Sequence, residues 1–250
     1  MNNGIKNETE IVNSINGKKF NELTDNLKSF IKFAFNKINN DDVITSSKIR
    51  SNSKADIKIE VNGSIKNISI KNGSENSIHS EKLDSFISFL QDLKIKPNII
   101  DHLKFYHYGD GTTEGNGIRR LSAEEAKIEY SDKIRIFNKY VSYDNFLSKM
   151  IERFLFDGIK GKTQADIIYY GNSLYGVWAS KEEILKYLLK NKSFYIKTIH
   201  FSKLTYQNYC RNINKNVKSE FRRKYIQIKW FSIVGDLQKI RDLNSIHQNM

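Results

Sequence analysis

The most regular pattern in the chain is a pair of segments, one on each side of Asn62-Gly63, in which apolar and polar residues alternate. An Asn-Gly pair between such segments predicts a tight β-hairpin, because both residues readily adopt the positive φ angles of a two-residue turn. This turn sets the register, so that Ile57 faces Ile68 across the two strands. The isoleucines of both strands then share the face that packs against a core.

The opposite face of this hairpin carries Asp56, Ser69 and Lys71 at its open end, because successive side chains in a strand alternate between faces. Lys71 is the diagonal neighbour of Asp56, within reach of a long side chain. A carboxylate beside an ammonium suits metal-assisted hydrolysis of a phosphodiester. The carboxylate can hold Mg²⁺, and the ammonium can orient or deprotonate the attacking water or offset charge on the phosphate. An ordinary ion pair on an exposed hairpin would give the same pattern.

Helical and alternating periodicities elsewhere predict a mixed α/β protein. We expect helices over about 7–15, 19–37, 81–93, 97–106 and 131–156, and another helix that begins after Ser180. Further strands are expected over about 43–47, in a hairpin over 165–178, and over 225–230.

Charge favours a polyanionic partner, since 41 Lys and Arg residues against 28 Asp and Glu give a formal net charge of +13. A solvated lysine-rich surface is the alternative reading. The single cysteine, Cys210, excludes an internal disulfide and most cysteine zinc sites. With neither an apolar leader nor a membrane-spanning segment apparent, we expect a cytoplasmic protein with no membrane partner.

The hairpin resembles the core motif of the PD-(D/E)xK nuclease superfamily, and the whole chain is similar to a type II restriction endonuclease. Asp56 matches the metal-binding Asp of the motif, although Ala55 stands where Pro is usual, and Lys71 matches its Lys. Ser69 stands where the motif has an acid, so one metal ligand is missing from the standard set.

The resemblance also indicates where a replacement acid could lie. Some restriction endonucleases with Ser at this position take the lost acid from the following helix. Here Ser80 is a plausible N-cap, and Glu81 is the favoured acid, with Asp84 and Glu75 as alternatives. Acids in the first turn of a helix also interact favourably with its dipole, whatever the function.

Two further features of the metal site come from the same resemblance. The carbonyl of Ile70 is expected as a ligand of Mg²⁺ together with Asp56 and Glu81. These nucleases also carry a Glu on an N-terminal helix, for which Glu22 is preferred to Glu10; a solvent-facing Glu is the simpler reading of each.

DNA contacts are expected from two basic segments. The glycine-dense stretch 107–120 ends in Arg119 and Arg120, and Arg222, Arg223 and Lys224 precede the last expected strand. Arginines and lysines in such places can reach phosphates or guanine edges. A flexible surface loop and a solvated face are the respective alternatives.

Together these features predict a restriction-endonuclease-like fold, with a central mixed β-sheet flanked by α-helices in a single nuclease domain over 1–250. Its catalytic core would span about 5–100, and its DNA-recognition loops and basic C-terminal part about 105–250. The resemblance implies Mg²⁺-dependent, sequence-specific cleavage of double-stranded DNA, a possible homodimer and a possible cognate DNA methyltransferase. The alternatives are a catalytically inactive DNA-binding protein of the same fold, or a nuclease that acts on RNA or structured DNA.

Overall fold

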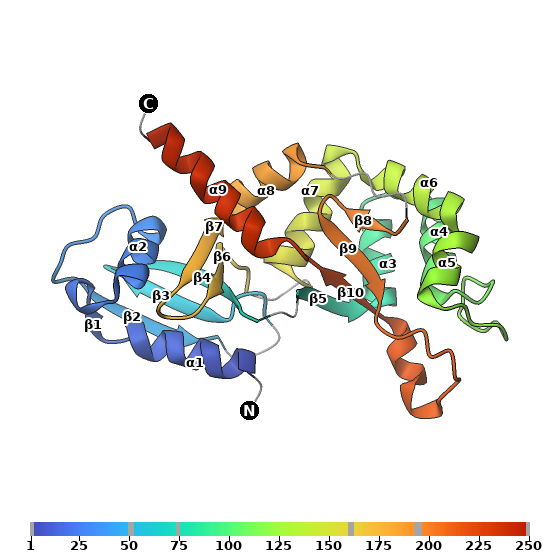
Figure 1. Ribbon diagram of the computed structural model, residues 1–250, viewed down its shortest axis with the longest axis horizontal. Coiled ribbons are helices and arrows are strands. Elements are labelled where there is room, and N and C mark those ends of the chain that lie inside the picture. Colours follow the sequence, from blue (N-terminus) through green and yellow to red (C-terminus); the bar gives the residue numbers. More distant parts are fainter. Residues whose placement is uncertain (1–2, 50–52, 74–75, 160–162, 193–196, 249–250) are drawn as a thin grey trace. The chain divides into compact units, whose positions relative to one another are not determined.

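The computed structural model describes residues 3–49, 53–73, 76–159, 163–192 and 197–248 (Figure 1). The chain forms two compact units, each assembled from separated stretches of sequence. Unit 1 comprises residues 1–76, 155–187 and 232–250, and unit 2 comprises residues 77–154 and 188–231. The expected division into a catalytic core at about 5–100 and recognition segments at about 105–250 stays a prediction.

Unit 1 contains a six-stranded mixed sheet with the strand order β1-β2-β3-β4-β6-β7. The strands are β1 (Lys18–Lys19), β2 (Val43–Lys48), β3 (Ile57–Val61), β4 (Ser64–Lys71), β6 (Ile167–Gly171) and β7 (Gly176–Ser180). All neighbours are antiparallel except β4 and β6, which run parallel. A mixed sheet was expected from the sequence, and its central place in the fold is confirmed.

The expected hairpin is the pair β3 and β4. Ile57 faces Ile68 in the observed register, and Val61 faces Ser64. Asn62 and Gly63 form the turn with φ angles of 50° and 78°, which is the left-handed region that a tight hairpin turn requires. Sequence alone therefore predicted this register correctly.

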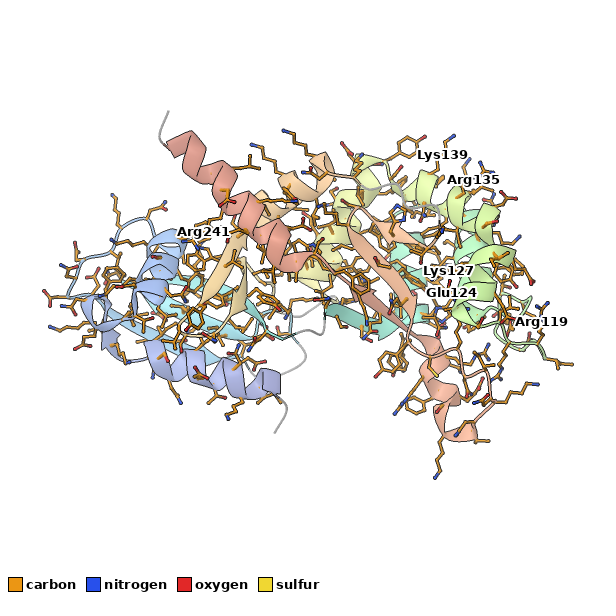
Figure 2. The ribbon with its side chains drawn as sticks, in the orientation of Figure 1. Arg119, Glu124, Lys127, Arg135, Lys139 and Arg241 are labelled. Carbon is orange, nitrogen blue, oxygen red and sulfur yellow. The ribbon has the colours of Figure 1, made fainter. Side chains whose placement is uncertain are left out.

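One face of the unit 1 sheet packs on helices α1 (Asn3–Ile15) and α2 (Asp25–Ala34). The shared core consists of buried side chains from both helices and five strands; among them are Ile11, Leu27, Phe30, Ile57, Ile68, Tyr169 and Trp178. Helix α9 (Ile233–Gln248) packs on β7, where Arg241 places its guanidinium 4.6 Å from the ring centre of Trp178 (Figure 2). Helix α8 (Lys181–Lys190) follows β7 directly and begins with the expected Ser180–Glu183 capping bonds.

Unit 2 has its own antiparallel sheet with the strand order β5-β10-β9-β8. The strands are β5 (Ser77–Lys82), β10 (Tyr225–Lys229), β9 (Leu204–Asn208) and β8 (His200–Phe201). Its helices are α3 (Leu83–Asp92), α4 (Pro97–Tyr108), α5 (Ala123–Glu129), α6 (Ser131–Val141), α7 (Asp144–Glu152) and the 3₁₀ helix η3 (Val217–Lys224). Phe86, Phe154 and Phe201 meet in its core, with ring centres 5.0 to 6.1 Å apart.

Three expected helices differ from the observed elements. The helix expected over 19–37 begins only at Asp25, because Thr24 caps it and a short 3₁₀ turn, η1 (Phe20–Glu22), comes before it. The helix expected from Glu81 was wrong at its start, since residues 77–82 pair with β10 as a strand. The long helix expected over 131–156 is divided into α6, α7 and a π-helical turn, η2 (Arg153–Asp157).

Within the ranges described above, none of the helices has both the length and the apolar character needed to cross a bilayer.

The hairpin turn allows a direct test of its backbone requirement. An added Cβ would meet no atom within 4 Å at either Gly63 or Gly235, but Gly63 has a φ of 78° and Gly235 lies inside α9. We expect Gly63→Ala to lower the free energy of unfolding by about 1 kcal/mol, because an L side chain is strained in this region. Gly235→Ala, the matched control, should be neutral or stabilising by up to about 1 kcal/mol. Urea unfolding of both variants measures this, and equal effects would contradict the assignment of the turn.

Candidate active site

Asp56 lies immediately before β3, with its backbone fixed on both sides. Its N–H donates to the carbonyl of Ile68 in β4 at 2.8 Å, and its own carbonyl accepts from the N–H of Ile49 at 2.9 Å. The residue is therefore held between the ends of β2 and β4, in the position that the hairpin register dictates. Its Cα atom cannot move without breaking this backbone pairing.

The carboxylate of Asp56 is held through one of its two oxygens. Oδ2 accepts from the backbone N–H of Ile70 at 2.6 Å and from the hydroxyl of Ser69 at 3.2 Å, and it lies 3.3 Å from Nζ of Lys71. Among the described residues, Oδ1 accepts no hydrogen bond. This leaves one carboxylate oxygen able to bind a cation while the other fixes the orientation of the group.

Lys71 occupies the last position of β4, with 26% of its side chain exposed, and Asp56 has 22% of its side chain exposed. The ammonium of Lys71 also donates to the carbonyl of Ile70 at 3.0 Å. Both charged groups thus reach solvent from the same face of the sheet. The expected juxtaposition of Asp56, Ser69 and Lys71 is present in the structure.

Tyr170 is a neighbour of this cluster that sequence analysis missed. It pairs with Lys71 in the parallel register of β4 and β6, and its hydroxyl donates to the carbonyl of Gly73. The tyrosine therefore ties the chain just after Lys71 to the adjacent strand. The signal for it was the expected hairpin over 165–178, but periodicity gave no indication that its first strand runs parallel to β4.

Ligands for a metal ion are few at this site. Ser69 is buried, with 1% of its surface exposed, and its hydroxyl is directed to Asp56. In the part of the chain that the structure describes, no three His, Cys, Asp or Glu side chains are grouped so that they could hold a metal ion. The available oxygens are Oδ1 of Asp56 and the carbonyl of Ile70, which is the limited set typical of Mg²⁺ sites that retain several waters.

Comparison with known proteins gives support at the level of structure. No protein-family model matches the chain, and no curated protein matches it in sequence. Among solved structures, the restriction endonuclease MspI in complex with its cognate DNA matches with a TM-score of 0.54 and 13% identity; the match covers 81% of this chain and 76% of MspI. The chain has a restriction-endonuclease-like fold. At this identity the likeness concerns the fold alone, and the α/β class expected from the sequence is confirmed.

Within this restriction-endonuclease-like fold, the carboxylate of Glu81 is bound by partners within unit 2. It lies in β5 of unit 2, where Oε1 and Oε2 accept from Nε and Nη2 of Arg153 at 2.9 and 2.6 Å. His79 contacts the same carboxylate at 2.8 Å, and none of the Glu81 side chain is exposed. As a metal ligand it would have to give up the partner that neutralises its buried charge, so Glu81 is not part of the site that we propose below.

The other candidate acids stay predictions as metal ligands, and the described ones have the following surroundings. Glu22 lies on the exposed turn η1 and accepts from the N–H of Lys19 at 2.9 Å, which is a local capping bond. Glu10 on α1 accepts from the hydroxyl of Ser173 at 2.9 Å. Asp84 is exposed in the first turn of α3 in unit 2, and Glu75 lies outside the described residues.

The arginines expected to contact DNA fall into two groups. Arg119 extends from the surface of unit 2, with 69% of its side chain exposed (Figure 2), and Arg222 and Lys224 are also exposed. Arg120 and Arg223 instead form internal ion pairs, Arg120 with Glu220 at 2.7 Å and Arg223 with Asp110 at 3.0 Å. These two side chains hold parts of unit 2 together, which could not be known from the number of basic residues in the sequence.

Glu81 generates a pH-dependent contribution to stability. Burial acts to raise its pKa, but hydrogen bonds from His79 and Arg153 outweigh burial and lower the pKa to about 2 from an ordinary value of 4.5. As the pH falls, Glu81 becomes protonated in the unfolded chain at a higher pH than in the folded protein. The contribution of Glu81 to the free energy of unfolding is therefore fully present above pH 4.5 and is lost as the pH falls towards 2.

We therefore expect the free energy of unfolding to fall by about 3 kcal/mol more in the wild type than in Glu81→Gln between pH 5 and pH 2. Glu124→Gln is the control, because Glu124 is 80% exposed and pairs with Lys127 on the surface of α5. Urea unfolding at a series of pH values measures the difference. Parallel curves for the wild type and Glu81→Gln would contradict the buried ion pair.

Proposed function

We propose that the protein is a Mg²⁺-dependent endonuclease that hydrolyses DNA phosphodiesters, and that it acts as a sequence-specific type II restriction endonuclease. The observation that carries the proposal is the Asp56–Lys71 pair, which lies at the start of β3 and the end of β4, two internal strands of the mixed sheet. The likeness in fold to MspI, which was solved with its cognate DNA, supports DNA as the substrate. The net charge of +13 is consistent with a polyanionic substrate.

Asp56, through Oδ1, and Ile70, through its carbonyl, are the residues that would hold Mg²⁺, with waters and a DNA phosphate as the remaining ligands. Bound there, Mg²⁺ would supply the positive charge that an anionic phosphodiester needs before water attacks it. In the structure the Ile70 carbonyl accepts a hydrogen bond from the ammonium of Lys71, so this carbonyl lies beside the charged pair.

Lys71 is the residue that serves the reaction at phosphorus. A water oxygen forms a bond to phosphorus and gives up a proton to solvent. The bond from phosphorus to one sugar oxygen breaks, and that oxygen takes up a proton from solvent to leave as a hydroxyl group. The ammonium of Lys71 orients the attacking water and offsets the negative charge that accumulates on the phosphate oxygens. Ser69 contributes indirectly, since its hydroxyl helps to fix the carboxylate of Asp56.

Variants of the pair test the proposal. We expect Asp56→Ala and Lys71→Ala each to lower the rate of plasmid cleavage with Mg²⁺ by at least about 10²-fold, because each removes a charge needed in the transition state. DNA binding should be largely unchanged. Lys58→Ala is the control: Lys58 lies on the same face of β3, is 40% exposed and pairs with Glu60. Full cleavage by either Asp56→Ala or Lys71→Ala would remove the catalytic assignment.

A catalytically inactive DNA-binding protein is the second candidate, because Ser69 stands at the acid position and few ligands surround Asp56. The plasmid assay separates the two candidates, since discrete fragments indicate an enzyme and a gel shift without cutting indicates a binder. Parallel assays on single strands, RNA and structured DNA test the other substrates. The homodimer and the cognate methyltransferase stay predictions.

A further inference from the structure

Residues 213–224, which we call the arm, form the later part of the connection from β9 to β10 in unit 2 and include the 3₁₀ helix η3 (Figure 1). The arm contains five basic residues, Lys215, Lys218, Arg222, Arg223 and Lys224, and a single acid, Glu220. Four of these cations are exposed, all except Arg223. Within the described part of the chain, none of these four forms an ion pair with a carboxylate. The outer surface of the arm is therefore cationic without local neutralisation.

The base of the arm is fixed by ion pairs, of which the one between Arg223 and Asp110 is buried. Arg223, only 2% exposed, donates to Glu220 at 2.8 Å, to Asp110 at 3.0 Å and to the carbonyl of Gly115 at 3.0 Å. Arg120 binds both oxygens of Glu220, at 2.7 and 3.1 Å. The single acid of the arm thus turns inward to two arginines, and the arm is attached to the glycine-dense loop that ends at Arg120.

The geometry of η3 arranges the outward residues in a row. A 3₁₀ helix has three residues per turn, so side chains three apart eclipse each other. Lys218, Phe221 and Lys224, spaced three apart, therefore share one face of the helix, which we call the ridge, and the guanidinium of Arg222 lies 5.7 Å from the ring centre of Phe221. Phe221 is 59% exposed, which is unusual for a phenylalanine and places a large apolar surface in solvent. With a rise of about 2 Å per residue, the two lysines are separated by about 12 Å, comparable to the width of a B-DNA major groove.

We propose that the arm is a contact surface for duplex DNA, with Lys218 and Lys224 at the phosphates on the two sides of a groove and Phe221 directed to the base edges between them. This inference rests on the proposed function, in which DNA is the substrate. It assigns Arg120 and Arg223 to the support of the arm rather than to DNA.

Charge decides between DNA and a second copy of this chain as the partner. Two arms, or an arm and another surface of a chain with a net charge of +13, would bring uncompensated cations together, which opposes association. A polyanion compensates the same cations and releases its counterions on binding. An exposed aromatic side chain between lysines matches a groove, where a thymine methyl offers an apolar contact.

The double variant Lys218→Ala/Lys224→Ala tests the phosphate contacts. Fluorescence anisotropy with a labelled duplex of mixed sequence, in EDTA so that no cleavage occurs, gives the affinity at several salt concentrations. We expect an affinity at least about tenfold lower than that of the wild type, and a slope of log K against log salt that is smaller by about 1.8, or about 0.9 per lost contact. Arg135→Ala/Lys139→Ala removes the same charge from the exposed face of α6 and should change neither value appreciably.

Phe221→Ala separates the apolar contact from charge. We expect about fivefold weaker binding, because the exposed part of the ring is no longer buried on association, with an unchanged salt slope. Thermal unfolding of each variant should match that of the wild type, since all the changed side chains are exposed.

The inference is overturned if the arm double variant binds DNA as the wild type does, or if the α6 variant loses as much affinity. It is also overturned if Phe221→Ala converts a dimer to a monomer in sedimentation experiments without changing DNA affinity, which would assign the ridge to a second copy. These outcomes are independent of catalysis. If the protein cleaves plasmid and the arm double variant binds DNA as the wild type does, only the proposal for the arm is rejected. If the arm variant loses DNA affinity but the wild type does not cleave plasmid, only the proposed nuclease activity is rejected.

Discussion

The hydrogen bond from the N–H of Ile70 to the carboxylate of Asp56, at 2.6 Å, is the contact on which the candidate site depends. It joins the start of β3 to the end of β4 and occupies one oxygen of the carboxylate, so that the other is left with a fixed direction. The ammonium of Lys71 lies beside the same oxygen because it follows Ile70 in the strand. A single strand pairing therefore sets the orientation of an anion and a cation together, and the chemistry follows from backbone geometry.

The parts of the fold that the sequence predicted are those governed by local rules. Asn62 and Gly63 determine a turn through their φ angles, and the turn determines which residues of β3 and β4 face each other. Pro97 opens α4, and Ser180 with Glu183 opens α8, each through a bond or a constraint within one turn of the helix. For the same reason, the register of the hairpin was enough to predict that Asp56 and Lys71 lie side by side.

The parts that could not be predicted depend on partners far away in the chain. Glu81 looked like the first residue of a helix, but pairing with Ile226 makes it part of a strand, and Arg153 satisfies its charge. Arg120 and Arg223 were indistinguishable from their exposed neighbours until Glu220 and Asp110 were seen beside them. No periodicity encodes contacts between residues about a hundred positions apart, so the roles of these buried ions were visible only in three dimensions.

The interleaved path of the chain has a consequence for how the protein is made. Strand β4 is completed at Lys71, but its parallel neighbour β6 begins only at Ile167, and α9, which covers β7, begins at Ile233. On a ribosome, the hairpin that carries the charged pair can form early, while the sheet around it waits until the intervening unit has been synthesised. Closing so long a loop is slow. During that interval the edge of β4 that pairs with β6 in the folded protein has no strand partner, and an unpaired strand edge is prone to aggregation.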